Sequence, residues 1–311
     1  MSRRHENLDQ FRWYFVHPKF WPLWLWFAIL WFVGRLPLPA IRSLGSATGK
    51  LVYSVAKSRR RVTLRNLELC FPEKSESERE SIAKQSFANA GMALWESGLI
   101  WFGRLSRIRK MHNIIGLEHL QKRDGEAILA LAMHNSCLEP AYGPLALEHS
   151  MKILFRVHNN PFWEYVAQKG RNRFNLELVS NKRVSRFVEY MREGHTGLIA
   201  ADHDLGRKNS IFVPFFGIQT ATVTTPSTLA TAANARVVFT CGYRTAKGYE
   251  VEISPMENFP SNDVHADIER FSATVEAHVR KHPAEYLWMH RRFKTRPEGE
   301  ESLYQKKDKK K

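Results

Sequence analysis

Cysteine is scarce in this sequence and is spread too thinly to build a scaffold. The 311 residues contain three cysteines, Cys70, Cys137 and Cys241, and no two of them form a CxxC pair. An odd number of widely spaced cysteines argues against a disulfide framework and against a thiolate metal site, and it favours a reducing compartment. HExxH and similar spaced ligand sets are missing as well, so we expect neither a metal nor another cofactor.

The sequence also lacks a long, strongly apolar run. A membrane-spanning helix needs about 20 apolar residues, whereas the most apolar stretch, FWPLWLWFAILWFVG at residues 20–34, has fifteen, among them four Trp and three Phe. Trp side chains favour the membrane–water interface. We therefore predict a membrane-anchoring hydrophobic helix over residues 20–40, which either spans the bilayer with help from the following LPLPAI or lies in the interface; a buried core helix is the alternative.

A cleaved signal peptide is a poor fit to the amino terminus. Residues 1–19 are polar and basic, and the apolar run begins only at Phe20. Cationic residues flank this run on both sides and are denser after it. By the positive-inside rule, this asymmetry favours a single N-terminal anchor with the bulk of the protein in the cytoplasm.

Acidic residues are too few to balance the basic ones. Lys and Arg number 47 against 31 Asp and Glu, a formal net charge of +16, of which the last six residues, KKDKKK, contribute +4. Residues 299–311 are predicted to form a disordered basic tail. The surplus indicates an anionic partner, which could be a nucleic acid, an anionic membrane surface, a phosphorylated substrate or an acidic carrier protein. Charge alone does not choose among these.

Apolar periodicity divides the rest of the chain into a helical region at 41–109 and an α/β domain at 110–298. In the first, Ser75 and Glu78 have the spacing of a capping box ahead of an amphipathic segment. In the second, short apolar runs alternate with stretches of helical composition. The runs are AILALAM (127–133), MKILFRVH (151–158), LELVS (176–180), GLIAAD (197–202) and RVVFTCGYR (236–244). This alternation predicts a mixed, largely parallel sheet flanked by helices, with ligands at the carboxyl ends of the strands.

The first of these runs leads directly into HNSCLEP, which places His134 and Glu139 five residues apart at a strand exit. A histidine there can accept a proton from a hydroxyl while a carboxylate holds its other ring nitrogen. We therefore predict that His134 is a general base and Glu139 its partner; a surface helix that carries both without chemistry is the alternative. Ser136 and Cys137 lie between them, but the absence of a GxSxG elbow argues against a covalent intermediate.

Three further segments carry residues suited to an anionic, acylated ligand. FRVHNNPF contains an arginine whose planar fork could grip phosphate or carboxylate. In DHDLGRKNSIFVPFFG, charged residues precede an aromatic wall, although its His and Asp could also ligate a metal. LWMHRRFKTRPEG concentrates cations as a phosphate site, a nucleic-acid site or a solvated surface would. The candidate substrate-binding residues are Arg156, Asn160, Asp202, Asp204, Arg207, Phe215, His290, Arg291 and Arg292.

Taken together, these motifs resemble the late acyltransferases of lipid A biosynthesis, the lauroyl and myristoyl transferases of Gram-negative bacteria, within the lysophospholipid acyltransferase superfamily. The likeness extends over nearly the whole chain, from HPKFWPLWLWFAILW and RNLELCFPE through HNSCLE, FRVHNNP and ADHDLGRKNSIFVPFFG to LWMHRRFKTRPEG. The superfamily's HxxxxD motif stands here as HxxxxE, and the RRFKTRPEG ending looks more like the lauroyl-type member.

The resemblance implies an O-acyltransferase of the cell inner membrane, with its catalytic domain on the cytoplasmic face. His134 would be the general base and Glu139 its partner, and Arg156, Asp202 and Asp204 would line the site. The donor would be an acyl carrier protein thioester. The acceptor would be the hydroxyl of a hydroxyacyl chain on Kdo2-lipid IVA, a tetra-acylated lipid A precursor.

Three other functions compete with this interpretation. They are a glycerophospholipid or lysophospholipid acyltransferase, a myristoyl-type relative, and a membrane-tethered protein that binds nucleic acid or lipid without catalysis. The strand-exit position of His134 favours catalysis, and we expect no nucleic-acid partner.

Overall fold

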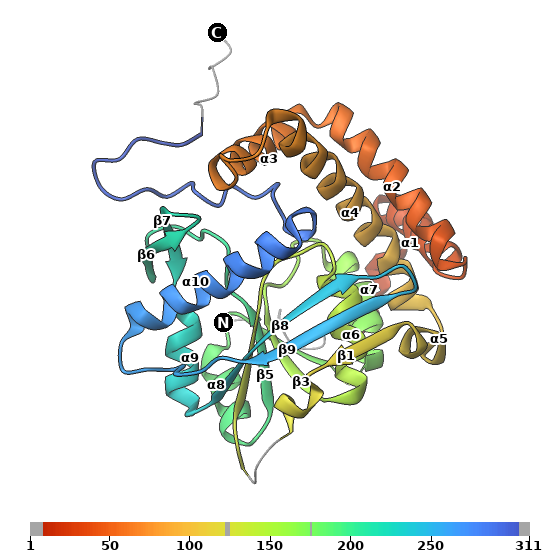
Figure 1. Cartoon of the computed structure of the whole chain (residues 1–311). Helices are drawn as coiled ribbons and strands as arrows, with labels where there is room; N and C mark the ends of the chain where they lie inside the picture. Colours follow the sequence, from red (N-terminus) through yellow and green to blue (C-terminus); the bar gives the residue numbers. More distant parts are fainter. Residues whose placement is uncertain (1–8, 122–124, 175, 305–311) are drawn as a thin grey trace.

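Helices occupy the first third of the chain and pack beside a central sheet (Figure 1). The structure is a computed structural model that describes residues 9–121, 125–174 and 176–304, so the lysine-rich end of the predicted tail lies outside the described residues. The amino-terminal elements are η2 (Trp13–Val16), η3 (Pro18–Phe20), α1 (Trp21–Val33), α2 (Leu38–Val55), α3 (Lys57–Cys70), α4 (Glu76–Phe102) and α5 (Leu105–Lys110).

Helix α4 begins at the predicted capping box. The Ser75 hydroxyl accepts a hydrogen bond from the Glu78 amide at 3.3 Å, and the Glu78 carboxylate accepts one from the Ser75 amide at 2.8 Å. Two amide groups that the first turn would otherwise leave unpaired are therefore satisfied. The capping box predicted from the spacing is confirmed.

Glycines let α2 and α4 approach each other closely. A Cβ atom added at Gly49 would lie 2.1 Å from the carbonyl oxygen of Phe87, and one at Gly91 would lie 2.2 Å from the carbonyl oxygen of Gly45. These neighbours are backbone atoms, which cannot swing aside as a flexible side chain can. The two helices therefore meet backbone to backbone.

A seven-stranded sheet forms the centre, in the order β1-β9-β8-β2-β5-β3-β4. Only β8 and β9 pair antiparallel within it, among the described strands. The predicted mixed, largely parallel sheet is thus confirmed. Its strands are β1 (His112–Ile115), β2 (Ile128–Ala132), β3 (Met151–Phe155), β4 (Leu176–Ser180), β5 (Thr196–Ala200), β8 (Arg236–Arg244) and β9 (Tyr249–Pro255).

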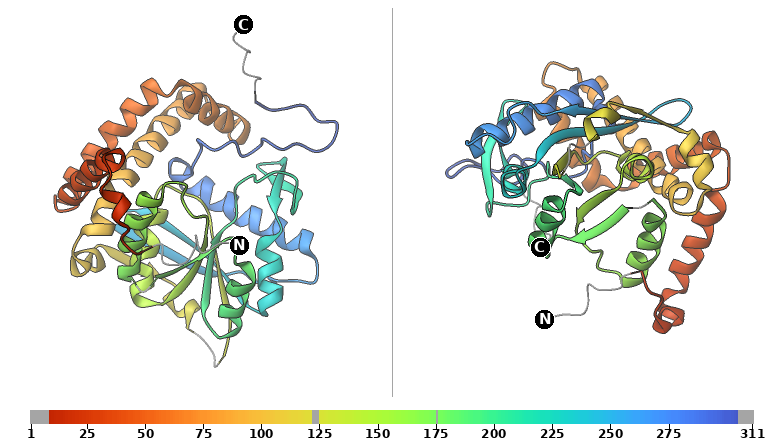
Figure 2. Two further views of the ribbon diagram at one scale, coloured as in Figure 1. Left: turned by 180° about the vertical axis from the view of Figure 1, so that it is seen from behind. Right: turned by 90° about the horizontal axis from the view of Figure 1, so that it is seen from below.

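Helices cover both faces of this sheet (Figure 2). Along β2 alternate side chains face opposite layers, as the twofold period of a strand requires: Leu129 and Leu131 join one core cluster, and Ile128 and Ala130 join the other. The remaining elements are α6 (Leu138–Glu148), α7 (Pro161–Arg171), α8 (Val184–Arg192), α9 (Thr225–Ala233), α10 (Val264–Lys281), the short helices η4 (Leu117–Leu120), η5 (Asn172–Phe174) and η6 (Pro283–Glu285), and a separate hairpin of β6 (Ser210–Phe215) and β7 (Ile218–Val223).

The hydrophobic helix predicted over residues 20–40 forms in two pieces. Helix α1 has 13 residues and ends at Val33, and α2 begins at Leu38. Within the described parts of the chain, the structure contains no helix that is both long enough and apolar enough to cross a membrane.

Candidate active site

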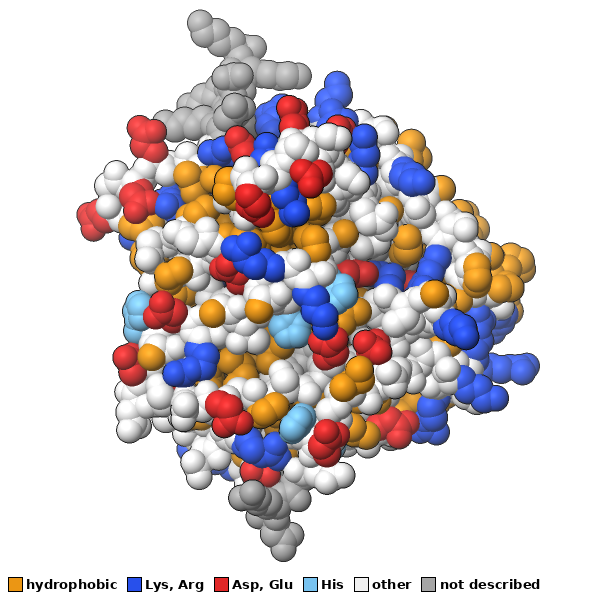
Figure 3. Space-filling model, viewed as in Figure 1, with side chains coloured by type: hydrophobic (Ala, Val, Ile, Leu, Met, Phe, Trp, Pro, Cys, Tyr) orange, Lys and Arg blue, Asp and Glu red, His pale blue; other side chains and the backbone are white. Residues whose placement is uncertain are grey.

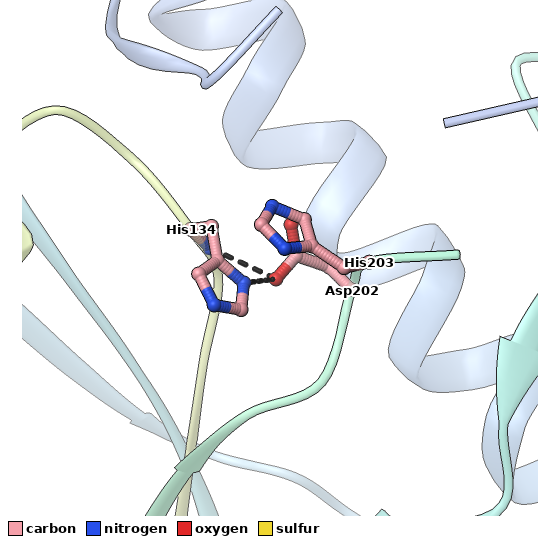
Figure 4. Close-up of side chains that lie close together, drawn as sticks. All are labelled: His134, Asp202 and His203. Atoms are coloured by element: carbon pink, nitrogen blue, oxygen red, sulfur yellow. Dashed lines mark hydrogen bonds and ion pairs between the residues drawn. The ribbon is translucent and has the colours of Figure 1, made fainter. Parts of the chain in front are cut away.

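The register of two neighbouring parallel strands brings His134 and Asp202 together. Ala132 of β2 pairs with Ala200 of β5, and His134 and Asp202 each follow two residues later. Since both chains leave the same edge of the sheet, their side chains meet there. The Asp202 Oδ1 atom accepts hydrogen bonds from the His134 amide at 2.8 Å and from Nδ1 of the His134 ring at 2.7 Å (Figure 4).

Asp202 is an ionised, buried carboxylate. Its exposed fraction is 1%. Burial acts to raise its pKa, but the neighbouring His134 and His203 and the hydrogen bonds from His134 outweigh burial and hold the pKa of this carboxyl well below its usual range. A carboxylate in this position fixes Nδ1 of His134 as the protonated nitrogen, which leaves the lone pair of the base on Nε2.

The Nε2 edge of His134 is accessible. The side chain is 31% exposed, and the structure shows no hydrogen bond from Nε2 to any described residue. A ring that is oriented on one side and open on the other can remove a proton from a bound hydroxyl. His134, at the exit of β2, therefore has the geometry of a general base.

Two more imidazole rings stack behind the base. The ring centroids of His134 and His203 are 3.6 Å apart with an interplanar angle of 12°, and those of His203 and His290 are 4.0 Å apart at 14°. We call these three rings the histidine column. Two unit charges about 4 Å apart repel each other by roughly 4 kcal/mol at an effective dielectric constant of 20, so the column cannot hold three charges. Burial lowers the pKa of His203 to about 3 and also lowers the pKa of His290.

We expect the free energy of unfolding to fall by about 2 kcal/mol between pH 7 and pH 5 because of His203 alone. The pKa of this group is about 3 in the folded chain and 6.5 ordinarily. Between these pH values the unfolded chain binds a proton at His203 that the folded chain does not. His203 therefore leaves the free energy of unfolding unchanged above about pH 6.5 and lowers it as the pH falls below that value. Urea unfolding of the wild type and of His203→Phe at both pH values measures it; an equal loss in the two proteins would contradict this expectation.

The predicted contact between Glu139 and His134 is wrong. Glu139 lies in the first turn of α6 and makes a bidentate ion pair with Arg171 of α7, at 2.9 Å and 2.7 Å. The indole of Trp101 donates a further hydrogen bond to it at 2.6 Å. Burial acts to raise the pKa of Glu139, but Arg171 and Trp101 outweigh burial and lower it. Asp202, from the neighbouring strand, therefore holds the nitrogen that the sequence assigned to Glu139.

Four other candidate residues serve the fold around the site. Asp204 accepts hydrogen bonds from the Thr295 amide at 2.6 Å and hydroxyl at 2.8 Å. Asn160 caps α7 by accepting hydrogen bonds from two backbone amides. Phe215 is fully buried, and Arg292 is 2% exposed with its guanidinium bound to β7. The structure therefore shows these four side chains hydrogen-bonded within the protein or buried, and their predicted contacts with substrate stay predictions.

The remaining cations stay at the surface. Arg156, directly after β3, and Arg207 are exposed, and Arg291 is partly exposed. Arg207 donates to the carbonyl of Arg296 at 2.7 Å, and Arg291 lies over the ring of Tyr304. The structure records no hydrogen bond or ion pair between Arg156 and any described residue. These three cations, together with His290 in the column, are the predicted binding residues that the structure leaves near solvent.

The side chains between His134 and Glu139 do not offer a nucleophile. Cys137 is fully buried, and burial raises the pKa of its thiol well above the ordinary value. The Ser136 hydroxyl donates to Glu285 and accepts a hydrogen bond from Arg244 at 2.7 Å. The guanidinium of Arg244 in turn pairs with the buried Glu96 of α4 at 2.7 Å. This ionic cluster, which the sequence did not reveal, joins the helical layer to the segment after β2.

His134, Asp202 and His203 do not suit a metal ion, although their ligand atoms lie within 4.8 Å of one another. A metal needs lone pairs that converge on it at about 2 Å. The rings of His134 and His203 overlap face to face and are nearly parallel, so their in-plane lone pairs run side by side. Of the two Asp202 oxygens, Oδ1 already accepts a hydrogen bond from Nδ1 of His134.

The fold and site define an α/β protein with a histidine–aspartate pair at the carboxyl ends of two parallel strands. Residues 8–295 match the family described as bacterial lipid A biosynthesis acyltransferase. The chain is 35% identical to the lipid A biosynthesis lauroyltransferase of Escherichia coli K12, over 96% of this chain and 99% of the relative. It is 34% identical to the palmitoleoyltransferase of the same strain, over 93% and 96%, and 36% identical to a lipid A biosynthesis acyltransferase of Haemophilus influenzae, over 97% and 99%.

The protein belongs to this family of lipid A biosynthesis acyltransferases. The resemblance found in its motifs is thereby confirmed, and the chain is an O-acyltransferase.

Proposed function

We propose that this enzyme transfers a fatty acyl chain, laurate, from acyl carrier protein to the hydroxyl of a hydroxyacyl chain on Kdo2-lipid IVA, with His134 as the general base. The observation that carries the proposal is the hydrogen bond between Nδ1 of His134 and the buried Asp202 carboxylate, which leaves Nε2 facing outward. The family relationship supplies the reaction class.

In the proposed reaction, Nε2 of His134 takes the proton of the acceptor hydroxyl as its oxygen attacks the thioester carbonyl carbon. The C–S bond breaks, an ester bond forms, and the thiolate leaves with the proton from the imidazolium. Asp202 keeps Nδ1 protonated throughout and stabilises the imidazolium by its charge. No covalent acyl-enzyme is needed, in keeping with the buried Cys137 and the engaged Ser136.

Cationic side chains near the histidine column are suited to binding anionic substrates, as the proposed reaction requires. Lys57, Arg59 and Arg61 of α3 are exposed, and Arg59 donates a hydrogen bond to the carbonyl of Met289, the residue before His290. An acidic carrier protein and a phosphorylated glycolipid both require such charges, and both contacts should weaken as salt rises. We assign Arg156, Arg207 and Arg291 to the acceptor phosphates because these residues keep solvent-exposed surface and belong to the segments that follow β3, β5 and η6.

Apolar side chains on the amino-terminal helices support attachment to the cytoplasmic face of the inner membrane. Phe27, Leu30 and Val33 form the inner face of α1, and the outer face is apolar too. Five outward side chains of α1 and α2 are between 61% and 67% exposed: Trp21, Leu25, Phe32, Leu51 and Val55. Figure 3 shows hydrophobic side chains over these helices, with Lys and Arg side chains beside them. Such a face, lying in the plane of an anionic bilayer, would bury its apolar side chains.

Replacing Leu25 and Phe32 together by Glu should weaken binding to anionic phospholipid vesicles at least about tenfold, because two large apolar contacts are lost. Co-sedimentation with vesicles measures the bound fraction. The matched control is Val264→Glu, which alters an exposed apolar residue of α10. Equal binding by the double variant and the control would exclude this face as the attachment surface.

The proposed reaction is tested with purified protein in mixed micelles. The donors are lauroyl-acyl carrier protein and lauroyl-coenzyme A, and the acceptors are Kdo2-lipid IVA and a lysophospholipid. We expect mass spectrometry to show one added lauroyl mass on Kdo2-lipid IVA with the carrier protein donor. Preferential acylation of the lysophospholipid would overturn the acceptor, and a preference for the coenzyme A thioester would overturn the donor.

A further inference from the structure

The rings of His203 and His290 lie behind the base in a column that the reaction does not require for proton transfer. His203 comes from the segment after β5, and His290 comes from the segment after η6, far along the chain. The ring of His203 is nearly parallel to that of His134 on one side and to that of His290 on the other. The column thus brings two imidazoles from distant parts of the chain onto one face of His134.

We propose that His203 is a positioning residue for His134: its ring, stacked between His134 and His290, holds the base in line with Asp202 and stabilises the charged ring that forms when the base takes its proton. The inference rests on the proposed function, because it needs His134 to become protonated during turnover.

The far end of the column is fixed to the helical layer. The side-chain amide of Asn66 in α3 donates hydrogen bonds to the carbonyls of Trp288 and His290, both at 2.8 Å. The hydroxyl of Tyr304 donates to the Asn66 side-chain oxygen at 2.5 Å. The backbone of His290 is therefore held against α3, and its ring covers the face of His203 that is opposite His134.

The middle of the column stays neutral. The Nε2 atoms of His203 and His290 are buried and find no hydrogen-bond partner among the described residues, so a protonated ring would leave an N–H unsatisfied. The groups that act on them electrostatically are Asp202, Asp204, His134 and Arg292. Tyr286, whose pKa is raised by burial and by Asp202, adds no charge. A neutral aromatic face beside a cationic ring is attractive, so the ring of His203 suits a neighbour that becomes cationic during the proposed reaction.

Two variants at one position separate ring stacking from other effects. His203→Phe keeps a flat aromatic face without a titratable nitrogen, whereas His203→Leu removes the face. We expect His203→Leu to lower kcat about 3- to 30-fold with KM unchanged, and to move the acidic limb of the kcat/KM profile about 0.5 to 1 pH unit lower, because the protonated base loses its stacking partner. His203→Phe should retain the kcat and pH profile of the wild type.

The control is His265→Leu, an exposed histidine of α10, and thermal unfolding of each variant verifies its fold. If folded His203→Leu matches the wild type in kcat and pH profile, the positioning role is overturned. It is also overturned if His203→Phe is as impaired as His203→Leu. Failure of the proposed function looks different, because then the wild type itself would not acylate Kdo2-lipid IVA, or His134→Ala would retain full activity.

Discussion

Replacing His134 by alanine should lower kcat for acyl transfer by about 10²- to 10⁴-fold, the usual contribution of a positioned general base. The acceptor hydroxyl would then have to lose its proton to water during attack on the thioester. The change also removes the hydrogen bond from the ring to the buried Asp202 carboxylate, so thermal unfolding of the variant must verify its fold. Product formation on Kdo2-lipid IVA, measured by mass spectrometry at saturating donor, gives the ratio of rates.

The matched control for this experiment is His265→Ala, which removes an exposed imidazole from α10. It should leave kcat within about twofold of the wild type, since surface changes away from a site have small effects. A folded His134→Ala protein that turns over at the rate of this control would refute the mechanism.

Asp202→Asn should reduce kcat by about 10²- to 10⁴-fold, because the imidazolium formed during attack would face a neutral amide in place of a carboxylate. The amide oxygen can still accept hydrogen bonds from the His134 amide and Nδ1, so the ring need not leave its place. The loss should therefore appear in kcat more than in KM. Steady-state kinetics at several acceptor concentrations separate the two parameters.

Two comparisons make the Asp202 result decisive. Glu139→Gln should lower kcat less than Asp202→Asn, because Glu139 pairs with Arg171 and not with His134. The double variant His134→Ala/Asp202→Asn should be no slower than His134→Ala alone, because two groups that act as a unit are not additive. A larger loss from Glu139→Gln than from Asp202→Asn would restore Glu139 as the partner of the base.

The class of fold could be predicted from short apolar runs because alternating strands and helices leave a regular pattern in hydropathy. The position of His134 followed from the same pattern, since a polar residue directly after a buried run marks a strand exit. The hydrogen-bond partner of His134 could not be predicted from this pattern. The sequence pattern favoured Glu139, five residues away on the same chain segment, whereas the residue that binds Nδ1 of His134 follows the adjacent strand β5.

The order of strands was the missing information. The run before His134 and the run before Asp202 both end in the same way, with a buried strand followed by a polar side chain. Had β2 and β5 been known to be neighbours, their carboxyl ends would have brought the two residues together. Burial was the other missing information, because a cationic run such as Arg291 and Arg292 does not reveal which guanidinium points into the protein.

The site includes residues that are synthesised late, after α10. His290 completes the histidine column, and Asp204 binds Thr295, so segments on both sides of α10 must be present together. A ribosome-bound chain that has made β2 and β5 already contains the base and its aspartate but lacks the ring that backs them. The chain thus completes its apolar amino-terminal helices α1 and α2 long before the histidine column can form.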